Sequence, residues 1–242
     1  MKRELMPLVA ALGLTAAATA SPVGVYINDD FPGTTLNATT WSNYSSPATA
    51  VTVADGTLTG GYAGGDNGAW VFANSPYAVH PEAGQTVVLS STNLTFGAWA
   101  SNNWWGLGVG GNTTGICLRQ LEASNVRVEI TGSSGQQNLY LSAPSGYLTT
   151  QFVGAWSISW SPTQVKIVSA NLGTVFDSTV QTLDGAGNPW NLPTAELVPV
   201  AKAYYSGFTF DNMTLEVTQI PEPASALLLG LALAGLGARK RR

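Results

Sequence analysis

Residues 51–60, VTVADGTLTG, place Asp55-Gly56 between two runs in which apolar and polar residues alternate. An Asp-Gly pair suits the central positions of a two-residue hairpin, because both positions require positive φ. Alternation with a period of two is typical of strands that are buried on one side. The stretch therefore predicts a β-hairpin.

The same pattern of short β-prone runs between turn residues continues over residues 23–217, and helical periodicity of useful length is absent. About a dozen strands without a sequence repeat favour an all-β, antiparallel two-sheet sandwich of the jelly-roll type. No low-complexity linker divides the body, so we expect one domain over residues 21–218. Besides the hairpin, strands are expected at residues 70–72, 85–91, 94–99, 105–109, 115–120, 126–130, 139–141, 155–160, 164–169, 174–180 and 208–217.

Three stretches of the body resemble the concanavalin A-like lectin/glucanase group of sandwiches. DDFPGTTLNATTW (29–41) is similar to that group's opening strand, Gly turn, Leu and Trp. WSISWSPTQVKIVSANLGTVF (156–176) is similar to its late hairpin, and GFTFDNMTLEV (207–217) to its closing strand. The resemblance implies a concanavalin A-like fold.

The two ends of the chain differ from the body. Residues 1–20 combine a basic start, an apolar stretch and Ala18-Thr19-Ala20, which is typical of a secretory signal peptide cleaved between Ala20 and Ser21. We therefore expect passage through the Sec export machinery.

The last residues, IPEPASALLLGLALAGLGARKRR (220–242), contain Pro221-Glu222-Pro223, an apolar run and a terminal basic cluster, Arg239, Lys240, Arg241 and Arg242. The prolines interrupt any regular element, and the run over residues 224–238 is a good helix former. Such a helix is roughly 22 Å long, and snorkelling of the first cations helps it span a hydrocarbon core of about 30 Å. The cations should remain in the cytoplasm. A buried helix of a soluble domain would carry polar residues on one face, and a GPI-attachment tail would end in its apolar stretch.

The order Pro-Glu-Pro, apolar helix and basic cluster over residues 219–242 resembles the PEP-CTERM sorting signal of exported bacterial proteins. The resemblance implies an exosortase as partner, a membrane-embedded cysteine protease that removes the helix. It also implies a transient inner-membrane intermediate, then the cell surface or extracellular matrix of a Gram-negative bacterium, and association with exopolysaccharide in biofilms.

Charge and cysteine content exclude several function classes. Without the two ends, the body has four basic and twelve acidic residues, so a nucleic-acid or anionic-lipid partner is not expected. Cys117 is the single cysteine and lies in an apolar stretch, which predicts an inert buried thiol, and the single histidine, His80, precedes a proline in an expected loop. One His and one Cys fall short of the usual zinc ligand set.

No catalytic cluster is evident. The resemblance implies a Glu-x-Asp-x-x-Glu pattern in active members, where two carboxyls flank one glycosidic bond. The nearest acids, Glu122 and Glu129, are separated by Ser124-Asn125, a predicted turn, and each is interpreted as a solvated surface charge. We therefore expect that the chain is not an enzyme and binds no cofactor.

Tryptophan is abundant, with eight residues, and three of them lie in FGAWASNNWWGLGVGG. Aromatic faces stack on sugar rings and Asn side chains bond to hydroxyls, so this stretch supplies candidate glycan contacts. Core packing is the competing interpretation, and adjacent strand positions would point Trp104 and Trp105 to opposite faces. The candidates are Trp99, Asn102, Asn103, Trp104 and Trp105; Trp41, Trp156 and Trp160 are assigned to the core and Trp190 to a loop.

Asp29, Asp30 and Asp211 suggest a structural Ca²⁺ site, with Asn212, if the first and last strands pair. The competing interpretation is ordinary turn and strand-end polarity. The sequence as a whole predicts an exported, non-enzymatic surface or matrix protein with a possible extracellular polysaccharide ligand. A structural or adhesion protein with protein partners, and an enzyme acting on polysaccharide through an unfamiliar site, remain alternatives.

Overall fold

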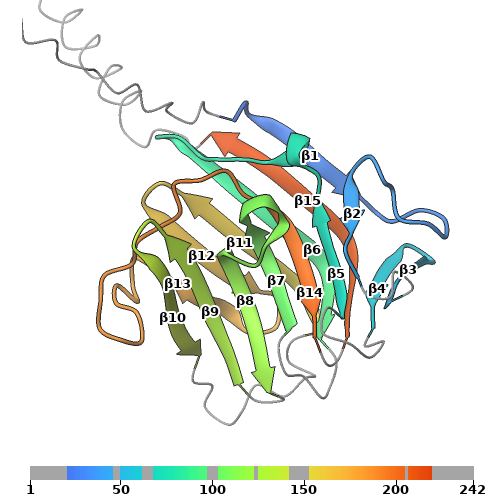
Figure 1. Cartoon of the computed structure of the whole chain (residues 1–242). Coiled ribbons are helices and arrows are strands. Elements are labelled where there is room, and N and C mark those ends of the chain that lie inside the picture. The colour runs from blue at the N-terminus through green and yellow to red at the C-terminus, as the bar shows by residue number, and fades with distance from the viewer. Residues whose placement is uncertain are drawn as a thin grey trace, which may run out of the picture.

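Two antiparallel sheets pack face to face in the computed structural model, which describes residues 21–45, 50–61, 68–96, 103–122, 125–141, 153–204 and 207–219 (Figure 1). Of Leu121, Glu122 and Asn125 only the backbone is described. The predicted all-β sandwich is confirmed.

The eight-stranded sheet is built around the last strand of the body. Its order is β13-β12-β11-β6-β15-β4-β3, and β1 pairs with β15 beside β4. The bounds are β1 (Gly24–Asp29), β3 (Val51–Ala54), β4 (Thr57–Gly60), β6 (Gln85–Phe96), β11 (Gly154–Ser161), β12 (Gln164–Ser169), β13 (Gly173–Asp177) and β15 (Phe208–Gln219).

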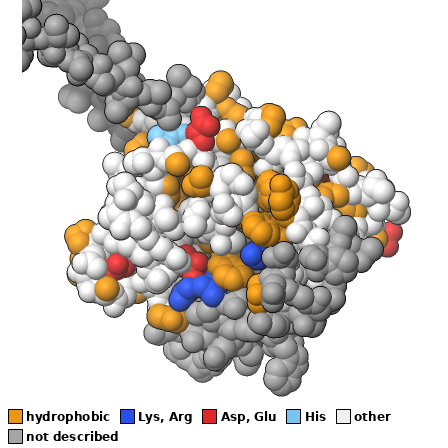
Figure 2. Space-filling model, in the orientation of Figure 1, with side chains coloured by type: hydrophobic (Ala, Val, Ile, Leu, Met, Phe, Trp, Pro, Cys, Tyr) orange, Lys and Arg blue, Asp and Glu red, His pale blue; other side chains and the backbone are white. Residues whose placement is uncertain are grey.

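The seven-stranded sheet has the order β10-β9-β8-β7-β14-β5-β2 and faces the viewer in Figures 1 and 2. Two short 3-10 turns, η2 (Ser75–Tyr77) and η3 (Val109–Gly111), lie in its connections. The bounds are β2 (Trp41–Asn43), β5 (Ala69–Ala73), β7 (Asn103–Gly108), β8 (Gly115–Glu122), β9 (Asn125–Gly132), β10 (Gly135–Leu141) and β14 (Val198–Ala203).

The opening hairpin prediction is confirmed by β3 and β4, which pair with Ala54 opposite Thr57. Asp55 and Gly56 take φ values of 52° and 77°, the positive values that a two-residue turn of this kind requires.

Several strand boundaries differ from the prediction. The separate strands expected at 85–91 and 94–99 form one strand, β6, because β15 pairs with it from Gln85 to Phe96. The strand expected over 174–180 ends at Asp177, whose carboxylate accepts the Thr179 N–H and turns the chain.

Sequence reasoning missed β14, which contains a proline. Pairing of β14 with β5 begins only at Val200, so Pro199 has β7 as its one strand neighbour. A residue without an N–H is tolerated where one side of the strand makes no ladder bond.

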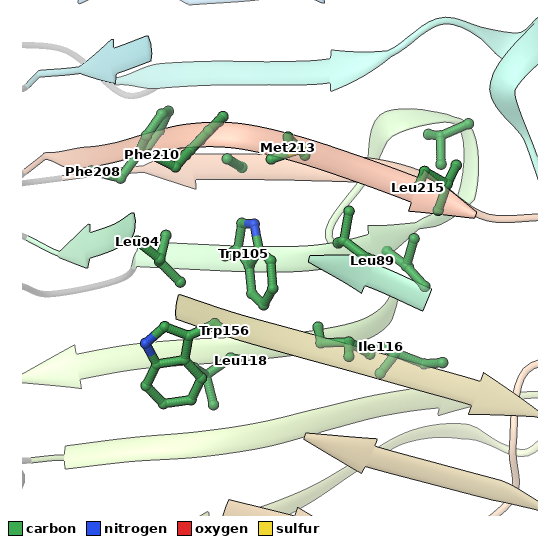
Figure 3. Close-up of a cluster of buried hydrophobic side chains, with 14 of the residues drawn as sticks. Leu89, Leu94, Trp105, Ile116, Leu118, Trp156, Phe208, Phe210, Met213 and Leu215 are labelled. Carbon is green, nitrogen blue, oxygen red and sulfur yellow. The ribbon is translucent and has the colours of Figure 1, made fainter. Parts of the chain in front are cut away.

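The core lies between the inner faces of the two sheets (Figure 3). Trp105 from the seven-stranded sheet and Trp156 from the eight-stranded sheet are both buried there, together with Phe208 and Phe210. Trp41 and Trp160 are buried as predicted. Each sheet thus buries one face and leaves the other available for function.

The predicted signal peptide with Ala20, and the predicted membrane helix over 224–238 with its flanking motif, lie outside the described residues. In the ranges that the structure does describe, no helix has both the length and the apolar character to span a membrane. Ser21, the predicted first residue of the mature chain, is buried, and its hydroxyl accepts the His80 N–H at 3.0 Å.

Candidate functional site

A row of aromatic and cationic side chains crosses the outer face of the seven-stranded sheet. Trp104 on β7 pairs with Arg119 on β8 and with Lys202 on β14, and partners in register project from the same face. Continuing in both directions, the register defines what we call the aromatic–cation row: Tyr140, Arg127, Arg119, Trp104, Lys202 and Trp70. At about 4.8 Å per strand the row is roughly 24 Å long.

Trp104 and Trp105 point to opposite faces, as predicted for adjacent strand positions. Trp105 is 0% exposed in the core, whereas Trp104 is partly exposed on the outer face. Asn103 shares the inward side and is also 0% exposed, with its amide donating to Gln120 Oε1 and to the Gly207 carbonyl. Asn103 is therefore not a surface contact, and Trp99 and Asn102 lie outside the described residues.

Glu129 holds the centre of the row together. Its Oε1 accepts hydrogen bonds from Arg119 Nη1 at 2.9 Å and from Arg127 Nε at 2.5 Å, and its Oε2 accepts from Trp104 Nε1 at 3.1 Å. The residue is 3% exposed, so the prediction of a solvated surface charge was wrong. Burial is possible because Arg127, two residues earlier on β9, and Arg119 on the neighbouring strand β8 bring two guanidinium groups to one carboxylate. Glu122 ends β8, and its side chain lies outside the described residues.

Each cation of the row lies against a ring. Arg119 Cζ is 4.3 Å from the centroid of the Trp104 ring, and Arg127 Cζ is 5.9 Å from that of Tyr140. Lys202 Nζ is 4.1 Å from the Trp70 centroid and 5.9 Å from that of Trp104. Burial lowers the pKa of the Lys202 ammonium group.

One end of the row is fixed by the turn η3. Trp70 Nε1 donates to the Gly111 carbonyl at 2.9 Å, and the Phe72 ring occupies the space that a Cβ on Gly111 would need. Tyr44 packs at 5.2 Å from Phe72 between ring centroids and is 64% exposed. Figure 2 shows basic side chains beside an acidic one on this face, among hydrophobic side chains.

Cys117 lies on β8, opposite Glu129 on β9, and is buried, as predicted for an inert thiol. Burial, and secondarily the Glu129 charge, raise its pKa, so the nucleophilic thiolate is strongly disfavoured. His80 packs edge-on against Trp160, with the ring centroids 5.4 Å apart.

The proposed calcium site is not formed. The first and last strands pair as required, but both Asp29 carboxylate oxygens are occupied by the Phe31 N–H and by Trp41 Nε1. Asp211 instead accepts from Thr57 and Asn93, and Asp30 is exposed. Within the described ranges, no three His, Cys, Asp or Glu residues could hold a metal ion.

Residues 219–242 match the PEP-CTERM protein-sorting motif. The chain carries a PEP-CTERM sorting motif at its C-terminus. This motif implies processing by an exosortase and export across the membrane toward the cell surface. No curated protein matches the chain.

The body of this PEP-CTERM chain is similar to solved glucanase structures. An endo-β-1,3-glucanase from Pyrococcus furiosus shares 13% identity at a TM-score of 0.54, covering 80% of this chain and 94% of the glucanase. A β-1,3-glucanase from Mycobacterium marinum shares 13% identity at 0.51, covering 83% and 100%. A sialidase shares 12% identity at 0.52, covering 80% of this chain and 18% of the sialidase. These likenesses establish a concanavalin A-like fold.

Sequence reasoning found Trp104 and missed the other members of the row. The available signal was the alternation in GICLRQ and VRVEI, which puts Arg119, Arg127 and Glu129 on one side of their strands. Lys202 and Trp70 join only through the register of β14, the strand that was not predicted.

Proposed function

We propose that this exported chain is a non-enzymatic glycan-binding protein of the cell surface or extracellular matrix, associated with exopolysaccharide in biofilms. The aromatic–cation row carries the proposal, because it sets Trp104, Trp70 and Tyr140 along one sheet face with polar groups between them. Aromatic rings stack on the apolar faces of sugars, while N–H donors bond to hydroxyl and acid oxygens.

The carboxylates of this face support a non-enzymatic role. Glu129 is the one carboxylate among the outward-facing side chains that the structure describes on these strands. Glycoside hydrolysis uses two carboxyls flanking the bond, and both oxygens of Glu129 already accept from Arg119, Arg127 and Trp104. A polysaccharide-active enzyme would need a second carboxyl facing this one.

Binding is tested with the full chain purified in mild detergent, by affinity electrophoresis and tryptophan fluorescence against neutral and acidic polysaccharides. We expect retention by at least one polymer, and about tenfold or more weaker binding for Trp104→Ala, with Trp104→Phe keeping most of the affinity. Retention by none of the polymers would overturn the proposal and favour a structural or adhesion protein with protein partners.

The non-enzymatic part has its own test. New reducing ends are counted after long incubation with the polymer that binds. We expect none above the background of heat-denatured protein. Release of ends that disappears in Glu129→Gln would make the chain an enzyme.

Processing is tested by intact mass and fractionation in the native host. We expect a species that begins near Ser21, lacks the residues after Pro221-Glu222-Pro223 and lies outside the inner membrane. A species that retains Arg242 in the inner membrane would contradict removal of the helix.

A further inference from the structure

The cations of the body are concentrated on one face. Of the four Lys and Arg residues between the two charged ends, Arg119, Arg127 and Lys202 belong to the aromatic–cation row. The fourth, Lys166, lies on β12 of the other sheet, in register with Asp177. A body with twelve acidic residues against four basic ones thus carries a locally cationic strip.

The aromatic–cation row keeps an excess of positive charge after its ion pairs with Glu129 are counted. Both salt bridges found among the described residues end on Glu129, which offsets one of the two guanidinium charges. Lys202 has rings within reach and no described carboxylate within 4.0 Å. The aromatic–cation row together with Glu129 therefore has a formal net charge of +2.

Lys202 is placed where an anion would stabilise it. Its amine is half-buried among Trp70, Trp104 and Tyr204, and burial lowers its pKa. Desolvating an ammonium group is costly unless an opposite charge compensates it, and cation–π contacts supply only part of that compensation. An acidic group arriving from outside would supply the rest.

The order of groups along the row matches a chain of rings with acidic substituents. Trp70, Lys202 and Trp104 occupy three adjacent strands, so ring, cation and ring are spaced by about 4.8 Å each. A sugar stacked on either ring would present its substituents to the ammonium group between them.

We propose that the ligand of this face is an acidic polysaccharide, with sparse carboxylate or sulfate groups that bind at Lys202 while its rings stack on Trp70 and Trp104. The inference rests on the proposed glycan-binding function and narrows it. A single-stranded nucleic acid also has rings and anions, but its dense charge is opposed by the acidic remainder of the body.

The test compares a largely methyl-esterified polygalacturonate that retains sparse carboxylates with the same polymer fully methyl-esterified, which keeps the rings and removes the charge. We expect the full chain to bind the acidic polymer about tenfold or more tightly, and to lose that advantage at high salt. Equal binding of both polymers would overturn the inference and leave the proposed function standing. If the chain binds neither polymer nor any other polysaccharide, both the acidic-ligand inference and the proposed glycan-binding function are overturned.

Matched variants identify the residue. Lys202→Met keeps the apolar stem between the rings, and Lys166→Met makes the same change on the opposite face. We expect Lys202→Met to weaken binding of the acidic polymer about tenfold and of the ester less than about twofold, with Lys166→Met close to wild type. Equal effects of the two variants would contradict the role of Lys202. Equally tight binding of a single-stranded oligonucleotide would overturn the ligand class.

Discussion

The two outer faces of this sandwich carry different chemistry over the same core. The eight-stranded sheet presents mostly short side chains, such as Thr214, Ser90 and Ser157, in register across β15, β6 and β11. The hydroxyls of Ser90 and Thr214 lie 2.5 Å apart and are satisfied by each other. The seven-stranded sheet presents rings and cations in the aromatic–cation row.

The difference supports our proposal that the seven-stranded sheet is the functional face. Core packing restricts which residues the inner faces can carry. An outer face that only contacts water needs no more than short hydroxyl side chains. Because the outer face of the seven-stranded sheet carries half-buried cations and rings in place of short hydroxyl side chains, it is the face to which we assign the proposed function.

The largest expected effect separates the inner from the outer face at adjacent residues. Trp105→Ala should lower the free energy of unfolding by about 3–5 kcal/mol, because it empties a fully buried site. Trp104→Ala should cost about 1–2 kcal/mol, because its ring is only partly buried. Denaturant unfolding measures both, and equal losses would contradict the division of roles.

A smaller effect separates the two outer faces. Glu129→Gln keeps the volume but leaves two guanidinium groups against a neutral amide, which should cost about 2–3 kcal/mol of unfolding free energy. The control on the other face, Ser90→Ala, removes a hydroxyl pair and should cost less than about 1.5 kcal/mol. The comparison fails if Ser90→Ala is the more damaging change.

The smallest effect concerns acid stability, which we expect to depend on carboxylates in the turns that follow β13. Hydrogen bonds from Thr179, above all from its hydroxyl, lower the pKa of Asp177, with a further contribution from Gln164. A lowered carboxyl pKa adds stability above about pH 4, the unfolded value, and that stability is lost as pH falls through the folded pKa. Asp177→Asn should therefore reduce the fall in melting temperature that the wild-type chain shows below about pH 4.

A second carboxylate checks the acid prediction. The Asn188 N–H lowers the pKa of Asp184, so Asp184→Asn should flatten the same range of the profile independently. Unchanged acid profiles in both variants would show that neither carboxylate contributes to acid stability.

Local signals were enough to predict the hairpin at Asp55-Gly56 and the opposite orientation of Trp104 and Trp105, because both depend on neighbouring residues. The row was not predictable in the same way. It requires the register between Trp70 and Lys202, which are far apart in sequence, and the second of these lies on a strand disguised by Pro199.

Pairing alone also proved insufficient. The first and last strands pair as the calcium hypothesis required. The Asp29 carboxylate, however, accepts a hydrogen bond from the Trp41 indole in the core. Glu129 shows the converse, since an acid that looked solvated is buried by two arginines. The partners of the Asp29 and Glu129 side chains decide whether each acid is free or buried. These partners depend on how the strands are placed in three dimensions.

The position of β15 has a consequence for timing. β15 joins β6 to β1 and β4, and it ends at Gln219, opposite Gln85, where the sorting motif begins. A chain made and exported from its N-terminus therefore lacks the middle of its larger sheet until the last residues of the body have crossed. The larger sheet is therefore completed only when β15, the segment directly before the sorting motif, becomes available for pairing.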